Sequence, residues 1–352
     1  MRRGLISWSR AEVPEAVLDA RVAAVQDAMA AHDLDGIAVY TTPARAAAVA
    51  WLAGFVPYWN QGLLVVPRAG RPILVSALSN RVADWLQLNA HVAAVRNTPR
   101  IGADAAAFVA STHASGRIGI VDLAGLPATM VADLTSGGLL AVDAAPLIAT
   151  ARASADPTDV ALHARAASIA HRAMMLARDH GGTAASLVAA IEQQARTDGA
   201  EEIYPALAVD LERSRALVRL EGDRPLADAY AVRISLAYKG AWVRLTRTFD
   251  RRHARSAAIA RAAVHFAEAA SALPDTARLA GSRSWLIEAT RTTMPLEPVA
   301  GANIPDPVTI EPGQIVNVQA TIDVDGCPVL LGAPVLTSRD GRPSGLLVQA
   351  LH

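Results

Sequence analysis

Apolar residues follow two different periods along the first part of the chain. From Pro14 to Ala31 they recur at the spacing of one helix face, at Val17, Ala20, Val25, Ala28 and Met29. Beyond this helix, short apolar runs bounded by Gly and Pro are typical of buried strands, and alanine-rich segments such as SNRVADWLQL separate them. The predicted strands are GIAVY, GLLVVP, GRPILVSA, RIGIV and LLAVD. This alternation of strand and helix predicts an α/β domain over residues 1–150.

The rest of the chain, residues 151–352, groups its helices and strands instead of alternating them. Asp156 and Pro157 suit the N-cap and first position of a helix, and a second helix is expected to end at Gly199. A β-hairpin is predicted over residues 230–249. The later segments ARSAAIARAAVHFAEAASAL and SRSWLIEATRTT are predicted as helices, and QIVNVQATIDV and PVLLGAPVLTS as strands. Two helix pairs, each followed by antiparallel strands, predict an α+β domain.

Composition narrows the class of protein. Hydrophobic residues make up 52% of the 352 residues and charged residues 19%, which is typical of a globular chain. The formal net charge is zero, and the sequence lacks the clustered cations that nucleic-acid binding requires. No apolar stretch is long enough for a membrane span, and the N-terminus does not have the pattern of a signal peptide. With its single cysteine, the chain is expected to be cytoplasmic.

The hairpin has the sequence YAVRISLAYKGAWVRLTRTF. It resembles the metal-binding hairpin of the creatinase, prolidase and methionine aminopeptidase superfamily, whose catalytic domain has the pita-bread fold. The segment AVAWLAGF is similar to part of the N-terminal domain of creatinase-type members. The resemblance therefore implies a creatinase-like α/β domain followed by a pita-bread domain over residues 151–352.

The resemblance also implies that the metal ligands of the superfamily are replaced. The two aspartates of the family hairpin fall on Ser235 and Arg244, and the glutamate of the strand that resembles EPGQIVNVQATI falls on Gln319. The last acidic ligand falls on Gly332, the catalytic histidine falls on Val218, and no histidine occurs between residues 266 and 351. Divalent metals need anionic or imidazole ligands, so we expect a degenerate member that uses no metal and no other cofactor.

Four positions are expected to lie together in the former metal cleft. Ser235, Arg244 and Gln319 keep the inward direction of the ligands they replace, and Asn317 shares a strand face with Gln319. The guanidinium of Arg244 can either bind an anionic or amide-bearing ligand or pair with an internal acid. Both interpretations remain open from the sequence.

Further residues are candidates for substrate contact. Arg247 in the T-R-T stretch either braces the sheet or contacts a ligand, and Tyr204 either offers its hydroxyl to the cleft or packs within a strand. Trp51, Tyr58 and Trp59 form an aromatic patch in a chain that is only 4% aromatic. The patch is interpreted as a core element, a dimer contact or a wall of the substrate site.

Two functions follow from these expectations. The first is a metal-independent homologue of Xaa-Pro peptidases and creatinase that acts on a small amide, guanidino or amino-acid-derived metabolite, as a hydrolase or lyase of C–N bonds. The alternative is a non-catalytic homologue that binds a ligand or a partner protein. A metallopeptidase is not expected, and the resemblance implies a homodimer.

Overall fold

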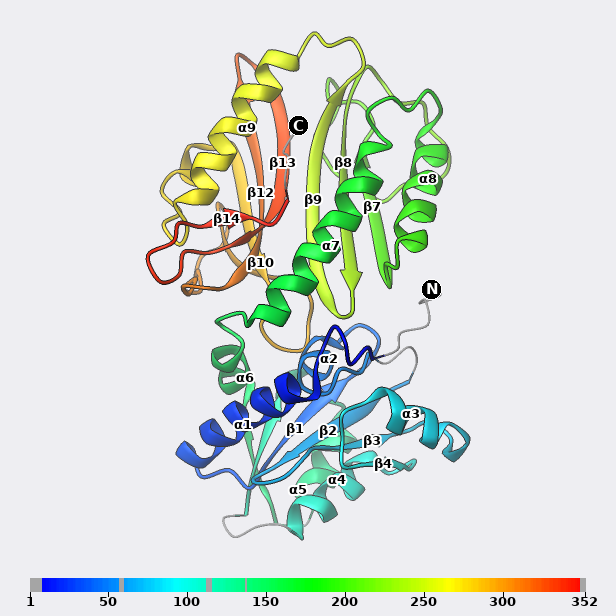
Figure 1. Cartoon of the computed structure of the whole chain (residues 1–352), viewed down its shortest axis with the longest axis vertical. Helices are drawn as coiled ribbons and strands as arrows, with labels where there is room; N and C mark the ends of the chain where they lie inside the picture. The colour runs from blue at the N-terminus through cyan, green and yellow to red at the C-terminus, as the bar shows by residue number, and fades with distance from the viewer. Residues whose placement is uncertain (1–7, 57–59, 112–115, 137, 349–352) are drawn as a thin grey trace. The chain divides into compact units, whose positions relative to one another are not determined.

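The computed structural model describes residues 8–56, 60–111, 116–136 and 138–348. The chain divides into two compact units (Figure 1). The N-terminal unit contains the described residues up to Ala153 together with the later segment Thr290–Pro295, and the C-terminal unit contains Ser154–Ala289 and the described residues from Leu296 onward. None of the described helices is both long and apolar enough to cross a membrane.

The N-terminal unit is built on a six-stranded sheet with the order β4-β3-β2-β1-β5-β6. Strands β1, β2 and β3 pair antiparallel, whereas β3 with β4, β1 with β5 and β5 with β6 pair parallel. Its strands are β1 Gly36–Thr41, β2 Gly62–Pro67, β3 Ile73–Ser76, β4 Ala94–Asn97, β5 Arg117–Val121 and β6 Leu140–Asp143. All five predicted strands of this part of the chain are present.

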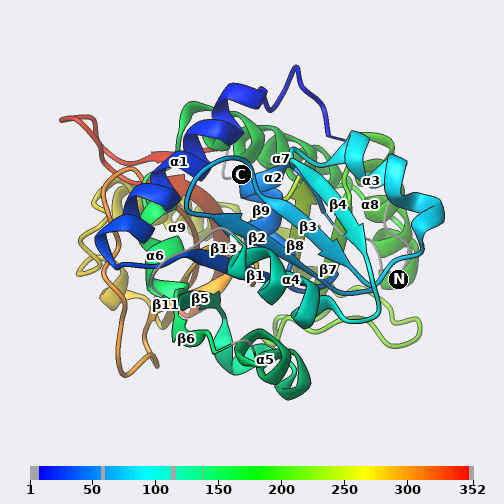
Figure 2. The ribbon, with the colours of Figure 1, turned by 90° about the horizontal axis from the view of Figure 1, so that it is seen from below.

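Helices cover both faces of this sheet (Figure 1, Figure 2). The helices are α1 Glu15–Ala31, α2 Ala47–Ala53, α3 Ala83–Asn89, α4 Ile101–Ala110, α5 Ala128–Thr135 and α6 Ala145–Ala151. Helices α1, α2, α3 and α6 pack on the face that carries Ile37 and Val39, and α4 and α5 pack on the face that carries Ala38 and Tyr40. Because adjacent strand residues point to opposite faces, strand β1 is buried on both sides. An α/β sandwich of this kind confirms the predicted fold class of the first domain.

The segment Thr290–Pro295 is held in the N-terminal unit by specific hydrogen bonds. The carbonyl of Thr293 accepts from the backbone N–H of Ala47 at 3.1 Å, and the Thr293 hydroxyl donates to Asp122 Oδ2 at 2.8 Å. The carbonyl of Thr292 accepts from Arg152 Nη1 at 3.0 Å. Asp122, at φ 66°, also pairs with Arg45. A short piece from late in the sequence is thus part of the first unit.

The C-terminal unit contains an antiparallel sheet with the order β11-β10-β12-β13-β9-β8-β7, to which β14 is added beside β13. Its strands are β7 Glu202–Ala208, β8 Ala229–Tyr238, β9 Ala241–Asp250, β10 Ser284–Ala289, β11 Glu297–Gly301, β12 Ile315–Val324, β13 Cys327–Leu336 and β14 Gly345–Leu346. The predicted hairpin corresponds to β8 and β9, which pair over ten residues. This sheet confirms the antiparallel α+β prediction.

Helices α7 Pro157–Met175, α8 Ala184–Thr197 and α9 Ser256–Ser271 pack on one face of this sheet (Figure 1). Helix α7 begins as predicted, since Asp156 Oδ1 accepts the backbone N–H of Asp159 at 2.8 Å and Pro157 follows the cap. Burial of residues such as Ile234, Leu245 and Val318 against these helices forms the largest core cluster. Within the described residues, no helix of this unit packs on the other face, which we call the polar face.

One predicted helix is wrong. The segment SRSWLIEATRTT contains strand β10, which pairs with β12 over six residues and with β11 on its other side. The apolar run Trp285 to Ile287 suits a helix or a strand, and the long partner strand β12 decides between them. The second half of this unit therefore has one long helix, α9, where a pair was expected.

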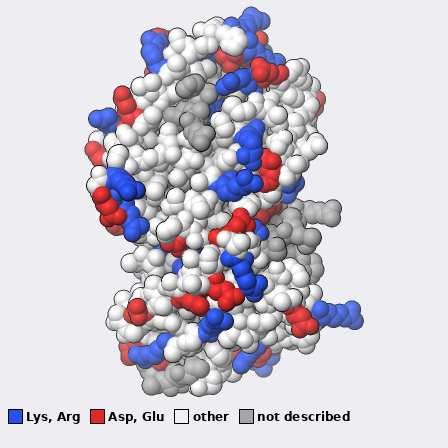
Figure 3. Space-filling model, in the orientation of Figure 1, with Lys and Arg blue, Asp and Glu red and all other residues white. Residues whose placement is uncertain are grey.

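Charged residues of both signs are mixed over the surface shown in Figure 3. This distribution agrees with the formal net charge of zero.

Candidate functional site

Four neighbouring strands bring the predicted cleft residues together on the polar face. Ser235 of β8 lies directly opposite Arg244 of β9, and Gln319 of β12 lies opposite Gly332 of β13. Gly332 in turn lies opposite Thr246, and this is the one ladder pair between β13 and β9 among the described residues. The sequence expectation that these positions share one face agrees with the register.

Asn317 and Gln319 connect the two halves of the sheet. Asn317 Oδ1 accepts the backbone N–H of Arg244 at 2.7 Å, and its Nδ2 lies 3.4 Å from the carbonyl of Trp242. Gln319 Nε2 donates to the carbonyl of Arg244 at 3.2 Å, and Gln319 Oε1 accepts from the hydroxyl of Thr246. The two amides therefore satisfy backbone groups of β9 where β9 and β13 barely pair. Their principal role in the structure is to hold the sheet together.

Arg244 is the centre of the site. Its Nε donates to Ser235 Oγ at 2.9 Å, and its Nη1 contacts both carboxylate oxygens of Glu288 at 2.5 and 2.6 Å. The Arg244 side chain is 19% exposed and that of Glu288 is 5% exposed, so the carboxylate is buried and the guanidinium is largely buried. The internal acid that the sequence left unidentified is Glu288.

Sequence reasoning missed Glu288 because it lies in the segment predicted as a helix. In the structure β10 places it opposite Asn317, on the same face as the other cleft residues. The signal available in the sequence was the arginine itself, because a cation at a buried position requires an acid nearby. That requirement alone does not say which acid supplies the charge.

A second arginine makes the site cationic. Arg233 of β8 lies two residues before Ser235, so it shares the polar face. Burial lowers the pKa of Arg233, and the positive charge of Arg244 lowers it further. Burial also raises the pKa of Glu288, although the pairing with Arg244 opposes that effect. Arg233 and Arg244 therefore interact electrostatically with each other and with Glu288, and these three groups together carry one positive charge in excess.

Tyr204 also lies on this face, because it pairs with Ser235 across β7 and β8. Its hydroxyl donates to Glu202 Oε2 at 2.8 Å, and its ring stacks on Trp242 with a centroid distance of 6.1 Å. This side chain forms part of the wall beside Ser235, with its hydroxyl already bonded to the protein.

Arg247 is not brought to the polar face. It alternates with Thr246 and lies on the side of the helices, where its Nη1 donates to the carbonyls of Thr246 and Gly332, each at 2.7 Å. Burial lowers its pKa to about 10. The structure therefore corrects the placement of Arg247 among the cleft residues, since it braces the junction of β9 and β13 from behind.

The aromatic candidates lie in the other unit. Trp51 is only 7% exposed and belongs to the core under α1 and α2, where the guanidinium groups of Arg21 and Arg152 lie over its ring at 5.3 and 5.4 Å. It is a core residue, and the structure does not support its assignment to a substrate wall. Tyr58 and Trp59 lie outside the described residues.

The side chains on the polar face do not suit a divalent metal. Of the positions that the sequence resemblance assigns to family ligands, Ser235 and Gln319 offer neutral oxygens, Arg244 is a cation and Gly332 has no side chain. The guanidinium of Arg244 already contacts both oxygens of Glu288, and Glu202, which shares the face of Tyr204, accepts from the Tyr204 hydroxyl. Among the described residues, no three His, Cys, Asp or Glu side chains are grouped as metal ligands.

Comparisons with known proteins agree with this architecture. Residues 21–154 match the family model of the creatinase/prolidase N-terminal domain. The chain is similar in structure to a prolidase from Pyrococcus horikoshii OT3, with 13% identity, a TM-score of 0.71 and coverage of 94% of this chain and 98% of the other. No curated protein matches the sequence.

Two further solved structures show the same likeness. An X-Pro aminopeptidase from Thermotoga maritima MSB8 has 11% identity and a TM-score of 0.72, and covers 94% of this chain and 97% of its own. The dipeptidase PepE from Mycobacterium ulcerans has 18% identity and a TM-score of 0.66, and covers 96% of this chain and 97% of its own. The N-terminal part of the chain thus matches the creatinase/prolidase N-terminal domain, and the C-terminal sheet unit has the pita-bread fold seen in the prolidase structures.

Proposed function

We propose that the polar face of the C-terminal unit binds a small metabolite without a metal ion. The metabolite carries a carboxylate and is an amide or another derivative of an amino acid. The observation that carries the proposal is the charge balance around Arg244. Arg233 and Arg244 lie beside the single carboxylate of Glu288, on a face that no helix of this unit covers within the described residues. A ligand carboxylate would neutralise the remaining positive charge.

The hydrogen bonds of the two arginines favour this use. The hydrogen bonds of the Arg244 side chain use its Nε and Nη1 atoms, so Nη2 is left for a ligand. The guanidinium of Arg233 makes no hydrogen bond or ion pair shorter than 4.0 Å with the described residues. A planar guanidinium binds a carboxylate through two parallel N–H···O bonds, which gives orientation as well as affinity. A cationic ligand such as a guanidino compound without a carboxylate would be repelled.

Binding does not by itself require catalysis. Both oxygens of Glu288 contact Arg244 Nη1, and this pairing reduces the basicity of the carboxylate. A site that holds the Glu288 carboxylate in an ion pair suits recognition of a ligand. We therefore favour a binding protein that uses the polar face of an inherited peptidase fold.

Catalysis is the second candidate, and one observation favours it. Burial raises the pKa of Glu288, which moves the carboxyl towards the range in which it can exchange a proton with a substrate. In this case water would add to the amide carbon as the C–N bond breaks, and Glu288 would take a proton from this water and pass it to the leaving nitrogen, while Arg244 and Arg233 hold the substrate carboxylate. The two candidates share the same site and differ in turnover.

The test uses the purified full chain in buffer that contains EDTA. N-acetyl amino acids, amino-acid amides and guanidino acids are screened for an increase in melting temperature, and each stabilising compound is then followed by NMR for turnover. The proposal predicts that carboxylate-bearing compounds bind and that Arg233→Gln weakens them about tenfold or more. Arg283→Gln is the matched control, because Arg283 forms an exposed ion pair with Asp323.

The results separate the candidates. Binding without turnover supports a binding protein, and turnover that Glu288→Gln abolishes while binding remains supports catalysis. Equal affinity in wild type and Arg233→Gln would contradict the proposal, as would a strict need for an added divalent metal.

A further inference from the structure

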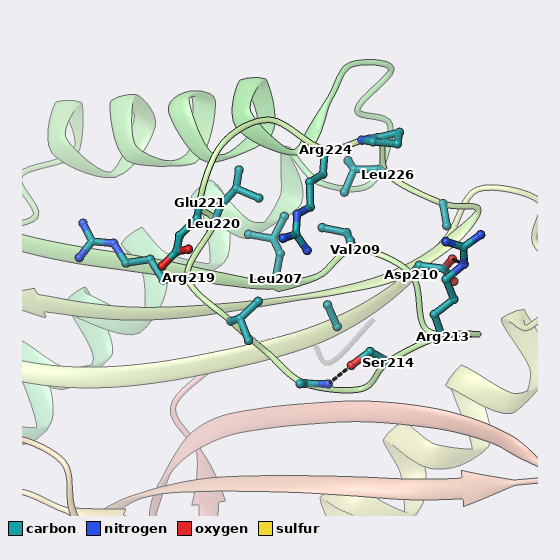
Figure 4. Close-up of a pocket in the computed structure, with 15 residues that line it drawn as sticks. Leu207, Val209, Asp210, Arg213, Ser214, Arg219, Leu220, Glu221, Arg224 and Leu226 are labelled. Atoms are coloured by element: carbon teal, nitrogen blue, oxygen red, sulfur yellow. Dashed lines mark hydrogen bonds and ion pairs between the residues drawn. The ribbon is translucent and has the colours of Figure 1, made fainter.

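A pocket lies at the end of β7, and its lining does not include Arg244 or Glu288. The connection between β7 and β8, residues 209–228, curves around a pocket of about 780 Å³ (Figure 4). We call it the loop pocket. Its volume is within the range of small-molecule sites, roughly 300–1,000 Å³. Leu207 and Leu226, which line it, belong to the core under the helices, on the opposite side of the sheet from Arg244.

Backbone hydrogen bonds give the loop around this pocket a defined shape. Leu207 and Val218 exchange both backbone hydrogen bonds, at 2.9 and 3.1 Å. The carbonyl of Arg224 accepts the N–H of Ala184, at the start of α8, at 2.9 Å. Asp223 Oδ1 accepts the N–H of Ala185 at 3.1 Å and that of Arg224 at 2.9 Å. The loop is therefore attached to both the sheet and a helix.

The floor of the loop pocket is apolar. Leu207, Val209, Leu220 and Leu226 line it, and Leu220 packs against the core cluster that contains Leu207. Val218, at the position aligned with the catalytic histidine of the superfamily, is 51% exposed. An exposed valine above a floor of leucines is apolar surface that a ligand would remove from water.

Of the charged residues that line the pocket, Arg213 has an ion-pair partner and Arg224 has none among the described residues. Arg213 contacts Asp210, with 3.3 Å between Nε and Oδ2. Arg224 makes no side-chain hydrogen bond or ion pair with the described residues, and Figure 4 shows its guanidinium directed inward between Leu207 and Val209. With Arg219 and Glu221, the lining has three arginines and two acids, so the pocket carries one positive charge in excess.

From these features we infer that the loop pocket binds an amphipathic monoanion, namely a small carboxylic acid with an apolar body of medium-chain size. The Arg224 guanidinium would pair with the carboxylate through two N–H···O bonds, and the apolar body would lie on Leu207 and Leu220. The loop pocket and the cluster of Arg233, Arg244 and Glu288 are independent, because they share no residue. Either can fail without the other.

The test uses octanoate as the probe and isothermal titration calorimetry of the full chain. We expect octanoate to bind with one site per chain at the loop pocket, and Arg224→Ala to weaken it about ten- to a hundredfold, the loss typical of a charged hydrogen-bonded contact. Arg213→Ala is the control, because this arginine is already paired with Asp210, and it should change the affinity little. Ala216→Trp, at an exposed lining position, should fill the pocket and abolish binding.

Two comparison probes test the ligand class. Octan-1-ol has the same apolar body without the charge. It should bind wild type more weakly than octanoate does, and it should bind wild type and Arg224→Ala with the same affinity. Inorganic phosphate should not compete with octanoate at equal concentration. The inference is overturned if octanoate does not bind, if Arg224→Ala binds it as tightly as wild type, if Ala216→Trp binds it unchanged, or if phosphate competes equally well. Loss of N-acetyl amino acid binding in Arg233→Gln with octanoate binding intact would show that the two sites are separate.

Discussion

The buried pair of Arg244 and Glu288 gives the sharpest prediction about stability. Arg244→Met removes the guanidinium and leaves Glu288, whose side chain is 5% exposed, without its cation. Breaking a buried ion pair in this way costs about 3–5 kcal/mol, because an uncompensated charge remains in a medium of low dielectric constant. The lost hydrogen bond to Ser235 Oγ acts in the same direction.

The stability lost in Arg244→Met should depend on pH, and the direction of this dependence follows from the pKa of Glu288. Its pKa is raised in the folded protein, so the folded state favours the protonated carboxyl, and this group destabilises the fold as the pH rises through its pKa. Without Arg244 the pKa rises further. The difference in unfolding free energy between wild type and Arg244→Met is therefore largest at neutral and alkaline pH and decreases as the pH falls and Glu288 is protonated.

Hydrogen exchange of peptides from β8, β9 and β10 measures this loss locally. A cost of 3–5 kcal/mol corresponds to exchange that is faster by about two to nearly four orders of magnitude. Adding Glu288→Gln to Arg244→Met should restore most of the protection, since the charge is removed. Arg283→Met, which breaks an exposed pair, is the control and should cost less than about 1 kcal/mol. If Arg244→Met costs no more than this control, or costs the same at all pH values, the reasoning is refuted.

Three further predictions concern side-chain packing and the hydrogen bond between Thr293 and Asp122. A Cβ at Gly332 would collide with the Gln319 amide, so Gly332→Ala should lower the free energy of unfolding by about 1–3 kcal/mol in thermal denaturation, and Gln319→Ala should relieve the effect. Asp122→Ala removes the partner of Thr293, and trypsin should then cleave after Arg291 faster than in wild type; an unchanged rate would contradict the described contact. Trp51→Ala should destabilise the N-terminal unit by about 3–5 kcal/mol without changing ligand affinity at the polar face. A loss of ligand affinity in this variant would indicate that Trp51 contacts the substrate.

Local sequence patterns were sufficient for much of the fold. The spacing from Val17 to Met29, the short Gly-bounded strands and the cap at Asp156 are local signals, and all are present as helices and strands. The hairpin was found both from its Lys-Gly turn and from its resemblance to a known superfamily. Its positions Ser235 and Arg244 led directly to the polar face.

The remaining features depend on residues distant in the sequence. Strand β10 exists because β12 and β11 pair with it, and nothing within its own residues excludes a helix, so Glu288 was missed. The bonds from Asn317 and Gln319 to the backbone of β9 required knowledge that β9 and β13 meet at one residue pair. Similarly, only the folded chain shows Thr293 beside Asp122.

The central claim is that the polar face works without a metal ion, and metal binding by the purified chain tests it most directly. After incubation with Mn²⁺, Co²⁺ or Zn²⁺ and removal of free ions, elemental analysis should find well below one metal ion per chain in wild type and in Glu288→Gln alike. One or two tightly bound ions per chain in wild type, lost in Glu288→Gln, would contradict the account.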